Sequence, residues 1–473
     1  MDGLNLLVHG GYAYNSLAVT NSVLANVTAL SSGSVTLSGN CNGFYNSPQF
    51  GGTRYIAQAE PFQTRAGGSH YLKADSNFRN VGSGNISAAI VTALRQRVVD
   101  PPVEIYGPIC ADTVLEPTAP RDTDTLDLGW HYEPLDYLLS EVPVSGATLA
   151  LTNGVAVGVW GPTGFKLQAG SRLISQGGPG NLNRLVRYIA VQEESHPYYP
   201  SDNSGTLFAE DLTIGFAPEV ELRFTELQLL SWSGKHFSGG SKLGRLSLQD
   251  CQLWGGALWF DQAGTAARTV ALTNTLFKRV SLTFGTGSDA TLTVFARNCL
   301  FRYCQPINLN AAPVNNWAWH DNFFDNSPVC LYYGAVPNSH NGYLGCSPMP
   351  GGTGNVTLGS FTYAGGLLGR LYQSSTSLQN MGSRSAAEAG LYHYTTRTSQ
   401  VKEGNTIVDV GYHYMALCSG AACDSDQDGL PGWWEDVNGN GAHETGEANW
   451  QDPDTDDDGL NDGEEVAGGT SPI

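Results

Sequence analysis

The chain has 473 residues, of which 58 are glycine, 41% are hydrophobic and only 14% are charged. Its formal net charge is −20, but residues 418–473 hold 15 Asp and Glu and no Lys or Arg, so the rest of the chain carries only about −5. This acidity argues against nucleic acid as a partner, and no apolar run is long enough to span a membrane. Abundant Gly, Thr, Ser, Asn and Val predict short strands and tight turns, hence an all-β fold.

The first part of the chain contains four motifs that recur in the same order before residue 417. The matched pairs are AVTNSVLANVTAL (18–30) with ALTNTLFKRVSL (271–282), NGFYNSP (42–48) with NFFDNSP (322–328), NVGS (80–83) with NMGS (380–383), and DLGWHYEPL (127–135) with DVGYHYMAL (409–417). We therefore predict two tandem copies of one architecture, residues 1–139 and 140–417, which end in homologous closing segments.

A 24-residue repeat runs through the second copy, between about 220 and 325. Successive steps of this length meet an acidic residue or its amide each time, at Glu226, Asp250, Asn274, Asn298 and Asn322. Apolar residues keep their own columns beside it, and segments such as VALTN and LSLQD alternate with the period of a strand. Each unit is therefore predicted to be a coil of short strands and turns stacked on the next.

This pattern resembles the right-handed parallel β-helix of the pectate-lyase type. The resemblance implies that the apolar columns fill the bore and that the Asn and Asp column forms a ladder at a turn, with a structural role. The stretch 146–193 looks like opening rungs, which places the start of the second β-helix near residue 140. Residues 1–139 then contain only the last rungs and the closing segment of the first.

The beginning of the chain does not fit a complete β-helix. An uncovered rung end is an aggregation hazard, and MDGLNLLVHGG has neither the basic n-region nor the apolar h-region of a signal peptide. We therefore expect a monomeric fragment of a longer chain, with a signal peptide upstream and an extracellular or cell-surface location.

No motif identifies catalytic residues, which stay unknown. His131 and His413 each follow an aspartate by four residues, Asp127 and Asp409, but their recurrence in two closing segments predicts a structural role. The sequence has no nucleophile elbow, zinc motif or phosphate loop. The close pairs Cys418 with Cys423 and Cys330 with Cys346 permit disulfides, while core thiols are an equal alternative.

Residues 424–435 match the calcium-loop pattern D-x-D-x-D-G-x5-E. The predicted ligands are Asp424, Asp426 and Asp428 at positions 1, 3 and 5, the carbonyl of Leu430 at position 7, and Glu435 at position 12. Calcium needs six to eight oxygen ligands, and Gly429 at position 6 permits the turn that makes the alternate side chains converge.

The same pattern occurs twice more. The second set is Asp436, Asn438, Asn440, Ala442 and Glu447, and the third is Asp454, Asp456, Asp458, Leu460 and Glu465. We call the three sets loop 1 (424–435), loop 2 (436–447) and loop 3 (454–465). Loop 2 has fewer charges and is expected to bind calcium more weakly. The alternative is a flexible acidic linker, which does not explain why Gly and Glu fall in place each time.

No helix fits between loops 1 and 2, so these are not ordinary paired EF-hands. The C-terminal segment 418–473, called the tail below, is similar to thrombospondin type 3 repeats and to dockerin-like calcium repeats of bacterial surface proteins. That resemblance implies a chain wrapped around ions, which is disordered without them.

Three functions are compatible with this sequence. The first is a secreted or cell-surface structural or adhesive protein, a β-helix rod with a calcium-stiffened connector. The second is a polysaccharide lyase or glycoside hydrolase that uses the β-helix groove, which only the fold analogy supports. The third is non-catalytic binding of a polysaccharide or cell-surface glycan through Trp232, Trp254, Trp259, Trp317 or Trp319, although packing is the alternative use of these rings.

Overall fold

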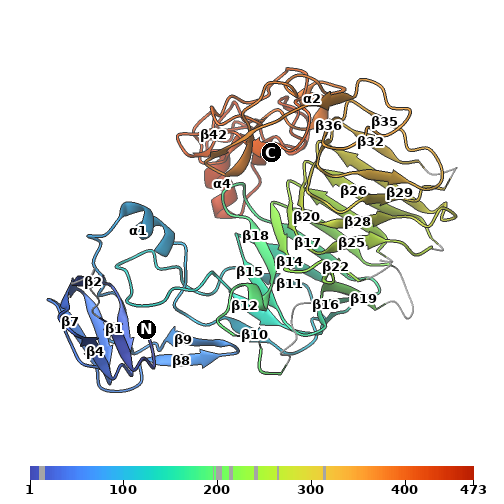
Figure 1. Cartoon of the computed structure of the whole chain (residues 1–473). Coiled ribbons are helices and arrows are strands. Elements are labelled where there is room, and N and C mark those ends of the chain that lie inside the picture. The colour runs from blue at the N-terminus through green and yellow to red at the C-terminus, as the bar shows by residue number, and fades with distance from the viewer. Residues whose placement is uncertain are drawn as a thin grey trace.

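The computed structural model describes residues 1–9, 16–194, 196–198, 205–211, 217–238, 243–263, 266–312 and 316–473. Most of its strands belong to three long parallel sheets of 11, 9 and 8 strands. The chain visits the 9-, 11- and 8-stranded sheets in turn, so each circuit adds one strand to each sheet (Figure 1). This arrangement is consistent with a parallel β-helix.

The strands of the three sheets are short. The 11-stranded sheet contains β10 (Val103–Ile105), β12 (Tyr137–Leu139), β15 (Ala156–Val159), β18 (Asn183–Arg187), β21 (Thr225–Gln228), β24 (Gln252–Trp254), β27 (Leu276–Lys278), β30 (Leu300–Arg302), β33 (Phe323–Asp325), β36 (Gly342–Leu344) and β37 (Val356–Leu358). The 9-stranded sheet contains β11 (Thr113–Leu115), β14 (Thr148–Thr152), β17 (Arg172–Gln176), β20 (Glu219–Arg223), β23 (Arg245–Gln249), β26 (Arg268–Thr273), β29 (Leu292–Arg297), β32 (Ala318–His320) and β35 (Asn338–Ser339). The 8-stranded sheet contains β13 (Val142–Val144), β16 (Thr163–Gln168), β19 (Thr206–Asp211), β22 (Lys235–Phe237), β25 (Ala257–Phe260), β28 (Ser281–Phe284), β31 (Ile307–Leu309) and β34 (Val329–Leu331).

The long sheets begin earlier than the sequence predicts. β10, β11 and β12 pair in parallel with the strands that follow them, so the sheets start at Val103 and not near residue 140. The connection between β11 and β12 contains residues 116–136, and this insertion hides the repeat. The long sheets therefore extend back beyond residue 140, and the division of the chain into domains stays a prediction.

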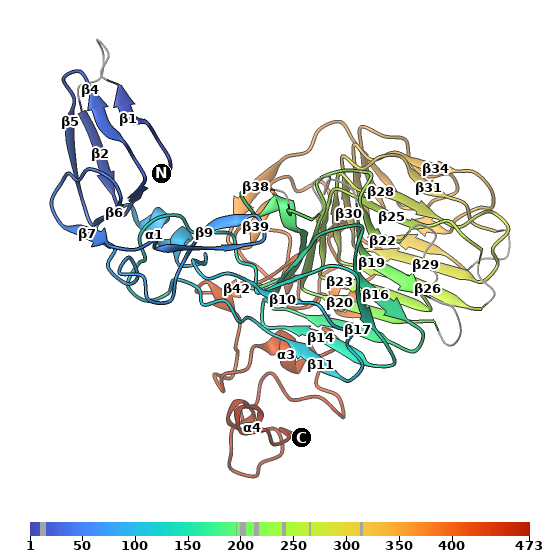
Figure 2. The same cartoon turned by 90° about the horizontal axis from the view of Figure 1, so that it is seen from below.

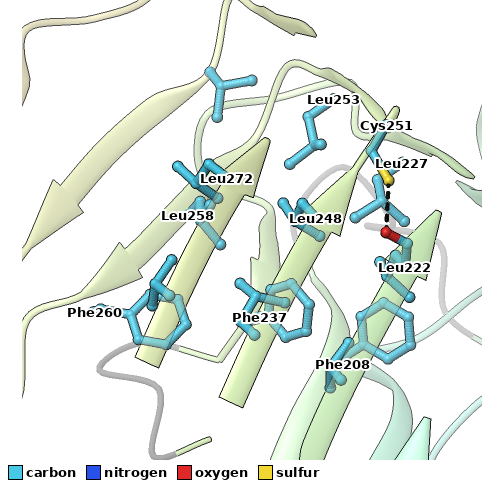
Figure 3. Packing of buried hydrophobic residues seen from close by; sticks show 14 of the residues in the cluster. Phe208, Leu222, Leu227, Phe237, Leu248, Cys251, Leu253, Leu258, Phe260 and Leu272 are labelled. Atoms are coloured by element: carbon cyan, nitrogen blue, oxygen red, sulfur yellow. Dashed lines mark hydrogen bonds between the residues drawn. The ribbon is translucent and has the colours of Figure 1, made fainter. Parts of the chain in front are cut away.

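Apolar columns fill the space between the sheets, because alternate side chains of each strand point inward. Leu222, Leu248 and Leu272 lie side by side on β20, β23 and β26, as Figure 3 shows. Phe301 is fully buried, and its ring stacks on Phe277 and Phe324 with centroids 4.9 and 5.1 Å away. Nearest-neighbour stacking of this kind stabilises repeat proteins.

The 24-residue spacing holds through several circuits and fails at the first and last predicted steps. Val270 pairs with Leu246 and with Val294, as predicted, but Leu222 pairs with Leu248, which is a longer step along the chain. One residue with left-handed backbone follows each of the strands β20, β23, β26, β29 and β32 of the 9-stranded sheet, at the turn toward the 11-stranded sheet. These residues are Phe224, Asp250, Asn274, Asn298 and Asp321. Glu226 and Asn322 are not among them. Asn322 instead points inward, where its amide donates to the carbonyl of Ala296 at 2.8 Å.

The N-terminal region forms a separate, shorter stack of parallel strands, which stands apart from the long sheets in Figures 1 and 2. Its paired strands are β1 (Leu6–His9) with β4 (Ala29–Ser32), β2 (Ser16–Thr20) with β5 (Thr36–Asn40), and β3 (Val23–Ala25) with β6 (Asn42–Tyr45) and β7 (Arg54–Ala57). A hairpin, β8 (Phe62–Arg65) and β9 (Gly68–Leu72), follows this stack, and α1 (Ala88–Leu94) precedes the long sheets.

The closing segment after the long sheets repeats the contacts of the first one. It contains the hairpin β38 (Tyr363–Gly366) and β39 (Gly369–Gln373), α2 (Ala386–Ala389), and β40 (Tyr394–Thr395) paired with β41 (Tyr414–Met415). Tyr372 stacks on Tyr414 at 4.2 Å, just as Tyr71 stacks on Tyr132 at 4.2 Å. The matched motifs therefore form matched contacts in both segments.

The tail contains little regular structure. It holds β42 (Leu417–Cys418) paired with β43 (Ala421–Ala422), and two short helices, α3 (Gly432–Glu435) and α4 (Asp462–Gly468). Figure 2 shows α4 and the C-terminus lying away from the long sheets. Across the described residues, no helix is both long and apolar enough to cross a membrane.

Candidate metal centre

The three tail loops share one hydrogen-bond frame. The amide of the glycine at position 6 donates to the aspartate at position 1 in each: Gly429 to Asp424 at 3.1 Å, Gly441 to Asp436 at 2.6 Å, and Gly459 to Asp454 at 2.9 Å. All three glycines have positive φ, between 77° and 104°, which a residue with a Cβ rarely adopts. The spacing of Asp and Gly therefore produces the same turn three times.

Loop 1 brings its predicted acids together. One carboxylate oxygen each from Asp424, Asp426 and Asp428 lies within 4.8 Å of the other two. Glu435, at the end of α3, is only 1% exposed, and among the described residues neither of its oxygens has a hydrogen-bond partner. Burial, followed by the charges of Asp426 and Asp428, raises the pKa of Glu435 to about 8. An orphaned buried carboxylate beside three others fits a cation with oxygen ligands.

Loop 3 repeats this gathering nearer the surface. Oxygens of Asp454, Asp456 and Asp458 lie within 4.8 Å of one another. Glu465, on α4, is 4% exposed, and its Oε2 has no partner among the described residues. Leu430 and Leu460 at position 7 donate their amides to the aspartates at position 5, at 2.7 and 2.9 Å. Their carbonyl oxygens as ligands stay a prediction, as does that of Ala442.

Loop 2 is arranged differently, because protein groups hold its side chains. Asp436 is buried and bonds to His393 Nε2 at 2.8 Å. The amides of Asn438 and Asn440 donate to Glu444 at 2.8 and 2.7 Å. Glu447 accepts the amides of Glu444 and Val437. In the part of the chain that the structure describes, no three Asp, Glu, His or Cys ligand atoms of loop 2 gather, so its predicted cation site lacks the carboxylate cluster of the other two.

The structure adds one acid that the loop pattern did not select. Oxygens of Asp428, Glu435 and Asp462 lie within 4.8 Å of one another, although Asp462 belongs to loop 3. The loop pattern assigns ligands only within each loop. The single signal available from the sequence is that position 9 of loop 1 is Gly432, which offers no side-chain oxygen, while position 9 of loop 3 is Asp462.

An aromatic and cation–π contact joins loop 1 to the long sheets. Trp433 packs edge-on against Phe224 at 4.9 Å, and the guanidinium of Arg223 lies 5.1 Å from the Trp433 ring. Trp434, the next residue, is 41% exposed. A disulfide joins Cys418 to Cys423 immediately before the loop, whereas Cys330 and Cys346 are free thiols. Loop 1 therefore begins directly after a disulfide-closed hairpin and contacts the long sheets through Trp433.

The recurring histidines are buried beside acids other than those the spacing suggested. His131 Nε2 lies 2.6 Å from Asp122, and His413 Nε2 lies 3.6 Å from Glu403. Asp127 and Asp409 instead accept the backbone amides of Asn80 and Asn380. Burial, followed by the charge of Asp409, raises the pKa of Glu403 to about 8, and burial lowers the pKa of His413 to about 4. Equivalent buried networks in both closing segments serve to hold those segments together.

One pocket combines aromatic and basic side chains on the long sheets. It has a volume of about 220 Å³ and is lined by Trp232, Trp254, Lys278 and Arg279 among others. The Lys278 ammonium lies 4.8 Å from the Trp254 ring. Trp317 and Trp319, by contrast, are fully buried in the core, so they cannot contact a glycan.

Comparisons of the chain with protein-family models, with curated proteins and with solved structures found no match.

Proposed function

We propose that this protein is an extracellular structural or adhesive protein, a right-handed parallel β-helix of the pectate-lyase type that carries a calcium-ordered C-terminal region. The three long parallel sheets support a rigid elongated body. The tail supplies a connector whose rigidity depends on calcium, similar to thrombospondin type 3 repeats of bacterial surface proteins. In this proposal, the tail links the β-helix to a further domain or surface.

One observation carries the calcium proposal, namely the buried carboxylate of Glu435 beside Asp426 and Asp428. Among the described residues it has no hydrogen-bond partner, and the tail contains no Lys or Arg. Burial of an unpaired charge is strongly unfavourable, and like charges at this spacing repel. A bound divalent cation removes both costs.

The chain's own residues divide the work of holding the ion. The side chains at positions 1, 3 and 5 and the carbonyl at position 7 provide oxygens from the loop, and Glu435 closes the site from α3. Calcium supplies the positive charge that lets these acids approach. Because Trp433 lies on the same short helix as Glu435 and packs on Phe224, closing the site also fixes loop 1 against the long sheets.

The location follows from the same chemistry. Loops of this kind in extracellular modules bind calcium in the millimolar range, and disulfides such as Cys418–Cys423 persist in oxidising compartments. Both features favour a secreted or cell-surface protein.

Calorimetric titration of the full chain with CaCl2, together with thermal unfolding in CaCl2 and in EDTA, tests this proposal. We expect saturable binding and a transition of the tail that calcium moves to higher temperature. Absence of binding heat, together with identical unfolding curves in CaCl2 and EDTA, would refute the calcium role.

The pocket at Trp254 supports a second candidate, binding of an acidic glycan. Sugar rings stack on aromatic faces, and carboxylated sugars pair with Lys and Arg. Burial, followed by the charges of Arg302 and Arg279, lowers the pKa of Lys278, so an anion would be favoured there. We expect Lys278→Ala to abolish binding of a polyuronate oligosaccharide, while Lys235→Ala, which removes a lysine stacked on Trp259 outside the pocket, leaves it unchanged.

The same assay addresses the enzymatic alternative. Release of unsaturated sugar from the polyuronate would make the protein a lyase, and release of reducing sugar would make it a hydrolase. Either product, if a pocket substitution abolished it, would replace the structural proposal.

A further inference from the structure

Loop 1 alone offers an incomplete shell of side-chain oxygens. Its second half reads Pro431, Gly432, Trp433 and Trp434 before Glu435, so no acid or amide is available between positions 7 and 12. A calcium ion needs six to eight oxygen ligands. The loop therefore leaves a place for an oxygen from elsewhere in the molecule.

Asp462 lies at this place, although loop 2 and the connection to loop 3 separate it from Glu435 in the sequence. One of its oxygens is within 4.8 Å of oxygens of Asp428 and Glu435. Its side chain is fully buried, and Thr455 fixes its orientation, because the Thr455 amide and hydroxyl donate to its two oxygens at 2.8 and 2.6 Å. Each oxygen keeps a further lone pair for a cation.

The two loops approach each other more closely than side chains would allow. The amide of Gly463 donates to Asp428 Oδ2 at 2.9 Å. A Cβ on Gly463 would lie 2.2 Å from the Asp428 carbonyl oxygen, which is well inside van der Waals contact. Glycine at 463 thus permits Asp462 to face loop 1.

Among the described residues, the charges in this contact have no protein counterion. In the described part of the chain, no Lys, Arg or His forms an ion pair with Asp428, Glu435 or Asp462. Glu435 is 1% exposed, has no hydrogen-bond partner among the described residues, and is aimed into the same cluster. Three carboxylates that meet in a buried contact between two loops, with an orphaned member, point to a bound cation and not to a solvated acidic surface.

We propose that Asp462 of loop 3 completes the cation site of loop 1, so that a divalent cation in loop 1 clamps α4 and loop 3 onto it. This inference rests on the proposed calcium role and adds a partner residue to it. The consequence is coupled binding: an ion in loop 1 positions Asp462, which holds Thr455 inside loop 3, so the first ion favours the second. The tail then orders as one unit and not as independent loops.

Terbium luminescence on the full chain tests this proposal, with Tb³⁺ as the calcium probe and excitation through tryptophan. Trp433 and Trp434 lie in loop 1, whereas loop 3 contains no tryptophan. We define the loop 1 signal as the part of the Tb³⁺ emission that the substitution Asp426→Asn removes. Asp462→Asn keeps the side-chain shape and both Thr455 contacts while it removes the charge. We expect it to weaken Tb³⁺ binding in the loop 1 signal by tenfold or more.

Asp457→Asn is the matched control. Asp457 is an exposed acid of loop 3 with left-handed backbone, which Asn tolerates, and it belongs to none of the gathered acid groups. We expect its loop 1 signal to equal that of the unchanged protein. Circular dichroism in EDTA checks that each variant retains its strands.

The outcomes separate the two proposals. Absence of Tb³⁺ binding by the unchanged protein would refute the calcium role itself. Binding by the unchanged protein with equal loop 1 affinity in the Asp462→Asn and Asp457→Asn variants would refute only the shared site and leave the calcium role standing.

Discussion

The long sheets and the acidic tail reach an ordered structure by opposite routes. Between β10 and β37 the chain buries columns of leucine, valine and phenylalanine, and this burial stabilises the fold without any ligand. Residues 418–473 hold 15 acids without one Lys or Arg, and their gathered carboxylates repel. One region is therefore stable by itself, whereas the other, in the calcium role that we propose, depends on dissolved ions.

The largest expected effect lies in the long sheets. Phe301→Ala removes a fully buried ring stacked between Phe277 and Phe324, and we expect it to lower the free energy of unfolding by about 3–5 kcal/mol. Denaturant unfolding should show the same loss in CaCl2 and in EDTA.

Phe295→Ala is the control for this change, because Phe295 lies on the same sheet circuit but is only partly buried. Phe295→Ala should lower the free energy of unfolding by clearly less than Phe301→Ala does. Equal losses for Phe295→Ala and Phe301→Ala would contradict the assignment of Phe301 to the stacked core.

The next largest effect is expected at the contact between loop 1 and the long sheets. Trp433→Ala removes the packing on Phe224 and Arg223, and loss of a buried tryptophan costs about 3 kcal/mol or more. We expect limited proteolysis in CaCl2 to release the tail faster. Trp434→Ala, at the exposed neighbouring position, should behave like the unchanged protein; faster release by both variants to the same extent would argue against specific docking.

Glu435→Gln should change the stability of the tail with opposite signs in CaCl2 and in EDTA. In calcium it removes a ligand, so the tail loses most of a stabilisation that reaches about 2.7 kcal/mol at a calcium concentration of 100 Kd. In EDTA at pH 9, above the raised pKa of about 8 for Glu435, it removes a buried charge beside like charges, so the tail gains stability. Thermal unfolding measures both, and destabilisation of equal size in EDTA would show that Glu435 serves packing and not an ion.

In the second closing segment, protonation neutralises the buried acid Glu403. This differs from the acids of the tail, for which we propose a bound cation. The pKa of Glu403 is raised to about 8 in the folded protein, so between its ordinary value and 8 the folded state binds more protons, and stability falls as pH rises. The lowered pKa of His413, about 4, acts in the opposite direction and only up to its ordinary value near 6.5.

Of these two groups, only Glu403 contributes between pH 6.5 and 8, and we expect it to add a decline of at most about 2 kcal/mol. Urea unfolding of Glu403→Gln should show a shallower decline, from which this part is missing. An unchanged pH slope in the variant would contradict the assignment.

Much of the repeat could be predicted from the sequence, because inward-pointing side chains must be apolar in every circuit. The 24-residue step correctly aligned Leu253, Phe277 and Phe301. It failed between Leu222 and Leu248, where a longer turn shifts the register, and at β10–β12, where the insertion at 116–136 interrupts the period. Strand pairing tolerates such insertions in turns, so spacing alone cannot locate them.

The candidate site was predictable to a different extent. Local spacing was sufficient for Asp424, Asp426 and Asp428, because one turn brings them together. It could not select Asp462, since the approach of α4 to loop 1 depends on tertiary contacts such as that of Gly463 with Asp428. Nor could it show that His393, from the closing segment, bonds to Asp436 of loop 2.

Hydrogen exchange of the full chain in CaCl2 and in EDTA tests the central contrast most directly. We predict that amides of residues 424–468 are protected in CaCl2 and lose that protection in EDTA, while amides of the long sheets exchange identically in both. Equal protection of the tail with and without calcium, or a parallel loss of protection in the long sheets, would contradict this account.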